Sequence, residues 1–290
     1  MTAAPAGTAR PPLRSRGRDL AGELLKLPAF GRRDLVTMLS YRYPFVGDVV
    51  GLLFQSVMFY FVGRLVSRDR MPVIGGVRPD YLAFVSVGIA VSAFMQVGLG
   101  RMLQSVQSER MLGTLESLLV TPTRLWAIQL GPAVYDLVYV PVRTGLFLTI
   151  VSLVYGVDLR LGGVLPATVV LLAFIPFVWG LGVLGAANIL TFRRGTTMVG
   201  FVTTLLSIGS GAYFPLELLP HWAQGAAQAN PVAIALAGLR GCLLGQAGWD
   251  DVWWRVAVLL PTSAVMVGLG AVAFRRAVVR ERRLGTIGLY

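Results

Sequence analysis

The sequence has 290 residues, of which 55% are hydrophobic and only 14% are charged, and its formal net charge is +12. A soluble globular protein has about 25% charged residues, so this composition excludes an ordinary water-soluble domain and favours a membrane protein. The basic residues flank apolar runs, which is typical of topology signals and contacts with anionic lipid, so we expect no nucleic-acid partner.

The N-terminal part of the chain is basic and amphipathic. Residues 1–29 lack an apolar core, and we expect a disordered basic tail. Residues 30–43 place Leu35 and Leu39 on one helical face and Arg33 on another. This pattern predicts a helix that lies in the membrane interface, and the alternative is the polar beginning of the first membrane span.

Six apolar runs predict transmembrane helices. They cover residues 44–65, 80–100, 125–155, 163–190, 196–213 and 252–274. The third run has 31 residues and would be about 46 Å long as a helix, so it must tilt or project beyond a hydrocarbon core of about 30 Å. Residues 276–290 are basic and predict a cytoplasmic tail.

Residues 214–251 are too polar and too often interrupted by proline for an ordinary span. Helical stretches lie on both sides of Asn230-Pro231, which predicts a re-entrant or surface-lying helical hairpin on the outer face. The alternative is a plain extracellular loop. The predicted fold is therefore an all-α, polytopic membrane protein with six transmembrane helices, an N-terminal interfacial helix and an outer re-entrant helical hairpin.

The distribution of arginine and lysine predicts the orientation. An even number of spans places both termini on one side, and the segments assigned to that side carry 18 basic residues, against six on the other. Cytoplasmic loops are enriched in such residues, so we expect both termini and the loop 101–124 in the cytoplasm.

The loop 101–124 contains the string SERMLGTLESLLVTPT at residues 108–123. Glu109 and Glu116 are two helical turns apart, and Thr121-Pro122 is a typical helix start because threonine caps exposed amides and proline suits the first helical position. We expect a short amphipathic cytoplasmic helix, which either binds a partner or merely joins two spans. Acid–base chemistry by the paired carboxylates is disfavoured, because the loop offers no nucleophile, histidine or set of metal ligands.

Two ionisable residues fall inside the third apolar run. Arg143 lies 12 residues, about 18 Å, before Tyr155, and Asp136 is seven residues earlier on the same face. Such residues are costly in a membrane and suggest a function, so they either line the transport pathway or serve packing as a buried charge pair, in which Asp136 or a group on another helix neutralises Arg143. The carboxylates of Asp48 and Glu217 lie near span ends, where we expect solvation or capping.

The loop string resembles the cytoplasmic loop of type-2 ABC exporter permeases, a family that includes daunorubicin-type and nodulation-factor exporters. A second resemblance lies in residues 209–240, GSGAYFPLELLPHWAQGAAQANPVAIALAGLR, which is similar to the outer segment of that family. By this resemblance residues 30–275 form an ABC-2 type transmembrane domain. The residues matching the family's ATPase-coupling motif are Glu109, Arg110, Gly113, Thr114, Glu116, Thr121 and Pro122.

The resemblance implies the permease subunit of an ATP-driven exporter in a bacterial cell (inner) membrane, moving a lipophilic drug, a lipid or a glycolipid. The sequence has no G-x-x-x-x-G-K-[ST] motif, so we expect a separate ABC ATPase subunit to bind ATP. We expect no catalytic residue, cofactor or metal in this chain. Such permeases usually pair as homodimers or heterodimers. The alternative function is a non-transporting membrane scaffold or a lipid-organising protein.

Overall fold

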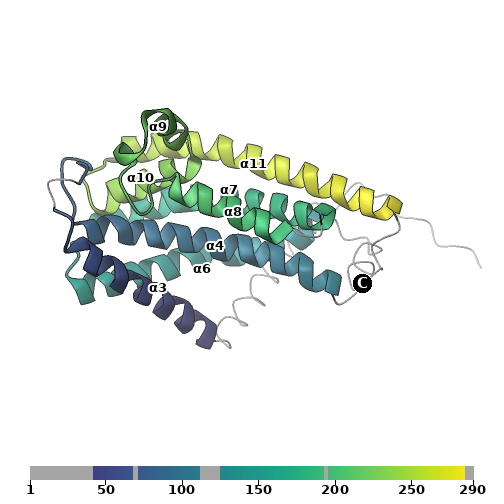
Figure 1. Ribbon diagram of the computed structural model, residues 1–290, viewed down its shortest axis with the longest axis horizontal. Helices are drawn as coiled ribbons and strands as arrows, with labels where there is room; N and C mark the ends of the chain where they lie inside the picture. The colour runs from purple at the N-terminus through teal and green to yellow at the C-terminus, as the bar shows by residue number, and fades with distance from the viewer. Residues whose placement is uncertain (1–41, 68–70, 112–124, 193–194, 285–290) are drawn as a thin grey trace, which may run out of the picture.

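The computed structural model describes residues 42–67, 71–111, 125–192 and 195–284. These residues are almost entirely helical, apart from turns and one isolated bridge between Ile74 and Val77. The helices, labelled in Figure 1, are α3 (Arg42–Gly63), α4 (Tyr81–Met111), α6 (Leu125–Tyr155), η2 (Leu161–Gly163), α7 (Val164–Phe192), α8 (Gly195–Ile208), η3 (Leu216–Leu218), α9 (His221–Gln228), α10 (Pro231–Leu243) and α11 (Trp249–Leu284). The prediction of an all-α fold is confirmed for this part of the chain.

Four of the described helices have apolar stretches long enough to cross a membrane. These stretches are Val46–Gly63, Tyr81–Gly100, Leu161–Thr191 and Trp249–Arg280. Helix α6 has 31 residues and the bounds expected for the third span, and the apolar stretch among those of its residues whose side chains are described is Tyr139–Tyr155. Helix α8 has 14 residues, about 21 Å, and ends well before the expected residue 213. The count of six spans therefore stays a prediction.

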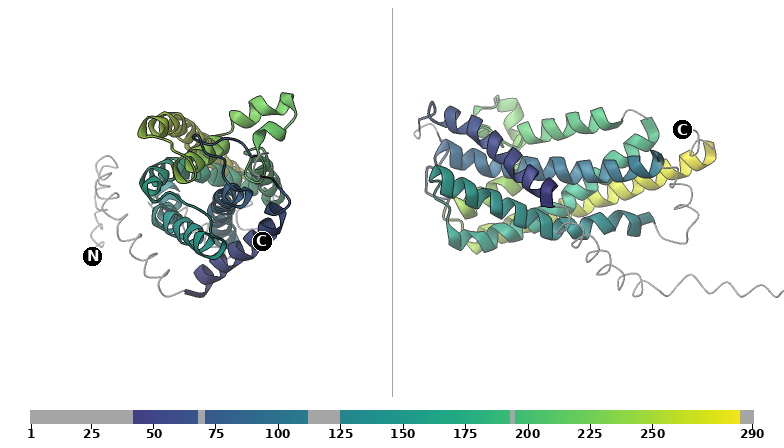
Figure 2. Two further views of the ribbon diagram at one scale, coloured as in Figure 1. Left: turned by 90° about the vertical axis from the view of Figure 1, so that its left-hand side faces the viewer. Right: turned by 90° about the horizontal axis from the view of Figure 1, so that it is seen from below.

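Helices α4 and α7 form the centre of the bundle, and α3 and α11 lie at its surface. Inside their apolar stretches, 83% of α4 and 72% of α7 is buried, against 17% of α3 and 22% of α11. Figure 2 shows α3 at the edge of the bundle, crossing it obliquely. The outer surfaces of these two helices expose large apolar side chains such as Phe54, Phe61 and Val265, as expected of surfaces that face lipid.

Helices α7 and α11 pack against each other through glycine. A Cβ atom at Gly180 would lie 2.5 Å from the main chain of Met266 and Val267, and one at Gly270 would lie 2.6 Å from the carbonyl oxygen of Gly180. Only residues without a side chain allow two helix backbones to come this close, as is common between membrane helices.

The connections between helices gather at two opposite ends of the bundle (Figure 1). One end holds the C-terminal ends of α4 and α11 and the α7–α8 connection. The other end holds the α3–α4 and α6–α7 connections with α9 and α10. The arginine distribution predicts that the first of these ends faces the cytoplasm, so we call it the inner end and the other the outer end; the side that each faces stays a prediction.

The segment 214–251 is a folded part of the outer end rather than an extended loop. Asn230 caps α10, because its side chain accepts a hydrogen bond from the amide of Val232 at 3.0 Å and Pro231 takes the first helical position. Ten of the 13 residues of α10 are buried. Helices therefore lie on both sides of Asn230-Pro231, as expected, and the alternative of a plain loop is wrong. Re-entry into the membrane stays a prediction.

The predicted tails lie partly or wholly outside the described residues. The interfacial helix at 30–43 falls almost entirely in residues the structure does not describe, and the N-terminal tail does so completely. At the other end of the chain, α11 continues to Leu284, ten residues past the expected end of the last span. Hydrogen bonds within a helix do not require apolar side chains, so the helix continues through the basic sequence after Phe274.

Candidate functional site

The sequence predicts a partner-binding segment where α4 leaves the bundle. Glu109 and Arg110 belong to the last turn of α4, which ends at Met111 at the inner end of the bundle (Figure 1). The other predicted coupling residues lie outside the described residues, and they are Gly113, Thr114, Glu116, Thr121 and Pro122. Glu109 and Arg110 therefore lie in the part of α4 that continues past its spanning stretch Tyr81–Gly100, which is the most buried of the four.

A cluster of polar side chains lies inside the bundle and joins α3 to α6. Arg143 of α6 is buried, and its Nε atom lies 3.7 Å from Oδ2 of Asp48 on α3. The hydroxyl of Tyr139, one helical turn before Arg143, donates a hydrogen bond of 2.7 Å to the same oxygen. Asp48 thus binds a cation and a hydroxyl from one neighbouring helix.

Asp136 lies in the same buried region and connects α6 to α7. Its side chain is buried, and Oδ2 accepts a hydrogen bond of 3.3 Å from the indole Nε1 of Trp179 on α7. The two residues named from the sequence, Asp136 and Arg143, are therefore both buried as predicted. The carboxylate that forms an ion pair with Arg143 is Asp48, on another helix, which is one of the alternatives left open by the sequence.

Asp48 is the third residue of the apolar stretch Val46–Gly63 and is partly exposed, as expected near a span end, but its carboxylate also binds Arg143 and Tyr139. It lies 15 residues, about 22 Å, before the outer end of α3, a depth similar to that of Arg143 on α6. The side chain of Asp48 is 39% exposed while that of Arg143 is 8% exposed. No local pattern near residue 48 shows which helix lies beside it, so the sequence alone could not identify this pair.

The ion pair is imperfectly satisfied in the described part of the chain. The Nε atom of Arg143 is buried and makes no hydrogen bond there, since 3.7 Å is beyond hydrogen-bond distance. Burying a charge without full hydrogen bonding is costly, and membrane proteins retain such groups mainly where they serve a function. The cluster can hold a charge inside the apolar layer, but it presents no arrangement of nucleophile and base.

Arg240 is a further buried cation that sequence reasoning missed. From α10 its Nε donates to the carbonyl of Phe84 at 3.1 Å, and its two terminal nitrogens donate to the carbonyls of Gly211 and Ala212 at 2.9 Å each. The guanidinium carbon also lies 3.4 Å from the centre of the Phe84 ring. Arg240 therefore fastens α10 to α4 and to the turn that follows α8. Arg240 is the last residue of the string 209–240 that resembles the outer segment of a known family, but that resemblance does not indicate this role.

The four apolar helical stretches that are long enough to cross a membrane identify the class as multi-pass helical membrane proteins. Within that class the sequence identifies the family: residues 32–244 match the ABC-2 type transporter family, and the chain belongs to it.

Two relatives have names that describe transport or resistance. One is the probable multidrug ABC transporter permease YbhR of Escherichia coli K12, 27% identical over 180 residues, which are 60% of this chain and 47% of the relative. The other is the linearmycin resistance permease protein LnrN of Bacillus subtilis 168, 28% identical over 112 residues, which are 38% of this chain and 29% of the relative. The matched region thus covers less than half the length of either relative.

Proposed function

We propose that this protein is the permease subunit of an ATP-driven ABC exporter that moves lipophilic, drug-like molecules across a bacterial inner membrane. Membership of the ABC-2 type transporter family supports the transport role. The names of the relatives, a multidrug permease and an antibiotic resistance permease, support a drug substrate rather than a glycolipid. The chain itself performs no ATP hydrolysis in this proposal, and a separate ABC ATPase supplies the energy.

The observation that carries the proposal is the way in which α4 reaches the inner end. Its apolar stretch ends at Gly100, and the helix continues without a break to Met111, about 16 Å further. The residues resembling the coupling motif begin in this extension. A partner that binds the segment 109–116 therefore acts on a helix that is continuous with the centre of the bundle.

In the proposed mechanism, ATP closes two ATPase subunits beneath a pair of permeases. Closure pushes the coupling segment, and α4 transmits the motion to α3, α6 and α7, which pack around it. A ligand shifts a conformational equilibrium only through its different affinity for the two states, and here that difference comes from ATP acting on the partner. The pathway for the substrate then closes on the inner side of the membrane and opens on the outer side.

The experiment that tests this function compares variants of the coupling segment in the assembled complex. Glu116→Ala removes a charge that the partner would bind, and Gly113→Pro changes the backbone of the segment. We expect either variant to lower ATP-dependent loss of a lipophilic dye from vesicles by at least about tenfold while the ATPase still copurifies, because truncating one side of an interfacial charge pair costs about 2 kcal/mol or more. ATP hydrolysis measured in parallel shows whether it has become uncoupled from transport.

Ser117→Ala is the matched control, because it alters the neighbouring side chain and leaves every charge of the segment in place. We expect it to transport like the unchanged protein. Wild-type transport by both Glu116→Ala and Gly113→Pro would contradict the coupling role. Absence of any ATPase from the purified unchanged protein would instead favour a membrane scaffold.

A further inference from the structure

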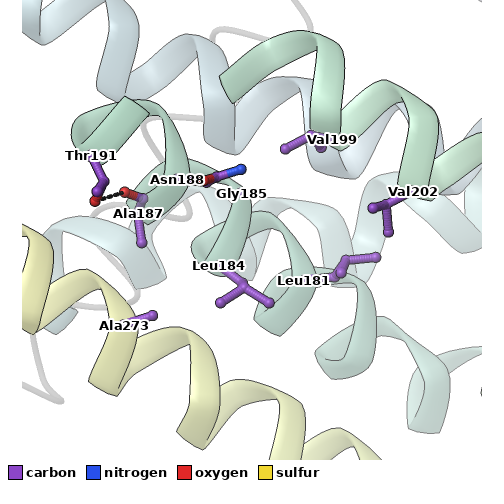
Figure 3. Close-up of a pocket in the computed structure, with 9 residues that line it drawn as sticks. All are labelled: Leu181, Leu184, Gly185, Ala187, Asn188, Thr191, Val199, Val202 and Ala273. Atoms are coloured by element: carbon purple, nitrogen blue, oxygen red, sulfur yellow. Dashed lines mark hydrogen bonds between the residues drawn. The ribbon is translucent and has the colours of Figure 1, made fainter. Parts of the chain in front are cut away.

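A pocket of about 360 Å³ lies between α7, α8 and α11 in the inner half of the bundle (Figure 3). Leu181 and Leu184 of α7, Val202 of α8 and Ala273 of α11 form apolar walls. In Figure 3 these side chains come from three helices and surround one space. The volume lies at the lower end of the range of about 300–1,000 Å³ that is typical of pockets for drug-sized ligands.

Small residues keep this space open and define its edge. Ala187 and Ala273 leave room that a longer apolar side chain would fill. At Gly185, a Cβ atom would lie 2.9 Å from Val199 on α8 and 3.1 Å from Leu103 on α4. Gly185 thus allows α8 and α4 to pack closely against α7 beside the pocket, while α11 forms the opposite wall.

Two polar side chains lie at one end of the pocket. The hydroxyl of Thr191 donates a hydrogen bond of 3.0 Å to the carbonyl of Ala187, so its proton is already used and its oxygen can only accept from a ligand. Asn188 points toward α8 in Figure 3; it already has an interaction partner within the protein, and an amide with two donor hydrogens and an acceptor oxygen can bind a second group beside that partner. The pocket therefore combines a large apolar surface with a small polar end, as ligand sites commonly do.

The pocket lies at the inner boundary of the apolar layer. The apolar stretch of α4 ends at Gly100, and Leu103, which lies beside Gly185, is one turn beyond it. The polar residues Asn188 and Thr191 follow Gly185 toward the inner end of α7. An amphipathic molecule in the inner leaflet places its polar group at this depth and directs its apolar part toward the bilayer centre.

We propose that this pocket, formed within a single subunit, binds a lipophilic small molecule with one hydrogen-bonding group as it leaves the inner leaflet. The apolar part occupies the space between Leu184, Val202 and Ala273, and the hydrogen-bonding group meets Asn188 or Thr191. This inference rests on the proposed export function and adds a first binding site for its substrate.

Photolabelling tests the pocket without requiring transport. The purified protein with its ATPase is placed in phosphatidylethanolamine–phosphatidylglycerol nanodiscs without ATP and irradiated with the photoreactive dihydropyridine azidopine, an apolar drug-sized molecule with N–H groups. A parallel sample contains phosphatidylethanolamine with a diazirine in its acyl chain. Labelled peptides are then identified by mass spectrometry.

We expect saturable labelling by azidopine in the peptides that contain residues 181–191, 199–202 and 273. Ala273→Trp fills the space from α11 and should reduce this labelling at least about tenfold, since even one methylene group in an apolar pocket changes binding by a factor of about 10 to 200. Ala271→Trp is the matched control, because residue 271 is exposed on the same helix, and it should label like the unchanged protein.

Labelling of these peptides by the lipid probe but not by azidopine would overturn the inference, since the pocket would then hold an acyl chain. Equal azidopine labelling of Ala273→Trp and Ala271→Trp would overturn it as well. Both of these results concern the pocket alone. The export function is tested separately, by ATP-dependent dye loss from vesicles that contain the unchanged protein. Saturable labelling without such export would retain the site and reject the exporter.

Discussion

Asp48, Tyr139 and Arg143 show how individual residues connect helices that are far apart in the sequence. The ion pair between Asp48 and Arg143 joins α3 to α6, and the hydroxyl of Tyr139 donates a hydrogen bond to the carboxylate of Asp48. Half of this cluster follows from the sequence, because ionisable residues in an apolar run are unusual wherever they occur. The other half does not, because the depth and direction of Asp48 depend on the tilt of α3 across the bundle.

Removing one charge of the pair between Asp48 and Arg143 should lower the free energy of unfolding more than removing both charges. Asp48→Asn leaves the guanidinium of Arg143 buried without its counter-charge, and we expect a loss of about 1–3 kcal/mol, less than for a fully buried pair because Asp48 is partly exposed. In the double variant Asp48→Asn with Arg143→Met no charge remains, and stability should return to within about 1 kcal/mol of the unchanged protein. Thermal unfolding of the protein in nanodiscs measures both.

Asp158→Asn serves as the control for that experiment, since Asp158 is an exposed acid between α6 and α7. Its melting temperature should equal that of the unchanged protein. If the double variant is as unstable as Asp48→Asn alone, the ion pair is not the source of the effect.

At the scale of whole helices, hydropathy predicts which segments are helical better than it predicts where each helix begins and ends. The bounds of α6 agree with the expected run 125–155, because apolar residues continue up to the turn at Gly156. Hydropathy fails where a helix leaves the apolar layer, as in α11, and where an apolar run contains a turn, as after Ile208. The packing of α7 on α11 through Gly180 is also beyond sequence reasoning, since the sequence has 34 glycines and, among those the structure describes, many meet no main chain.

The α7–α11 contact should tolerate no side chain at Gly180. Alanine favours helix formation by about 1 kcal/mol over glycine, but at Gly180 its Cβ would overlap the main chain of Met266. We therefore expect Gly180→Ala to destabilise the protein by about 1–3 kcal/mol. Unfolding by heat, followed by the loss of helical circular dichroism, provides the measurement.

Gly268→Ala is the comparison variant on the partner helix. A Cβ atom there would meet nothing within 4 Å, so the gain in helix propensity should appear and the protein should be unchanged or slightly more stable. A gain of the same size for Gly180→Ala would show that the two backbones do not touch.

At the scale of the molecule, the bundle has two chemically different ends. The outer end carries the packed helix α10 and a group of exposed tryptophans, among them Trp222 and Trp254, as expected of an aromatic belt at a membrane surface. The inner end carries the extensions of α4 and α11 beyond the apolar layer. The proposed orientation places the second end in the cytoplasm, where the proposed ATPase subunit would bind.

Chemical labelling of single cysteines tests that orientation. In a Cys242→Ala background, Leu65→Cys lies at the outer end with its side chain 86% exposed, and Arg280→Cys lies near the inner end of α11. A membrane-impermeant maleimide added to intact spheroplasts should modify residue 65 at once and residue 280 only after permeabilisation. The reverse pattern would mean that the coupling segment faces away from ATP.

The way in which α10 is fastened has a consequence for how this protein tolerates mutation. The three acceptors around Arg240 are main-chain carbonyls, so no substitution at Phe84, Gly211 or Ala212 can delete one of them. For the same reason, no exchange of side chains at those positions can compensate for the loss of Arg240. The hydrogen bonds that hold α10 therefore depend on one side chain, that of Arg240, and genetic suppressors of a change at position 240 should not be found at the three positions that supply the carbonyls.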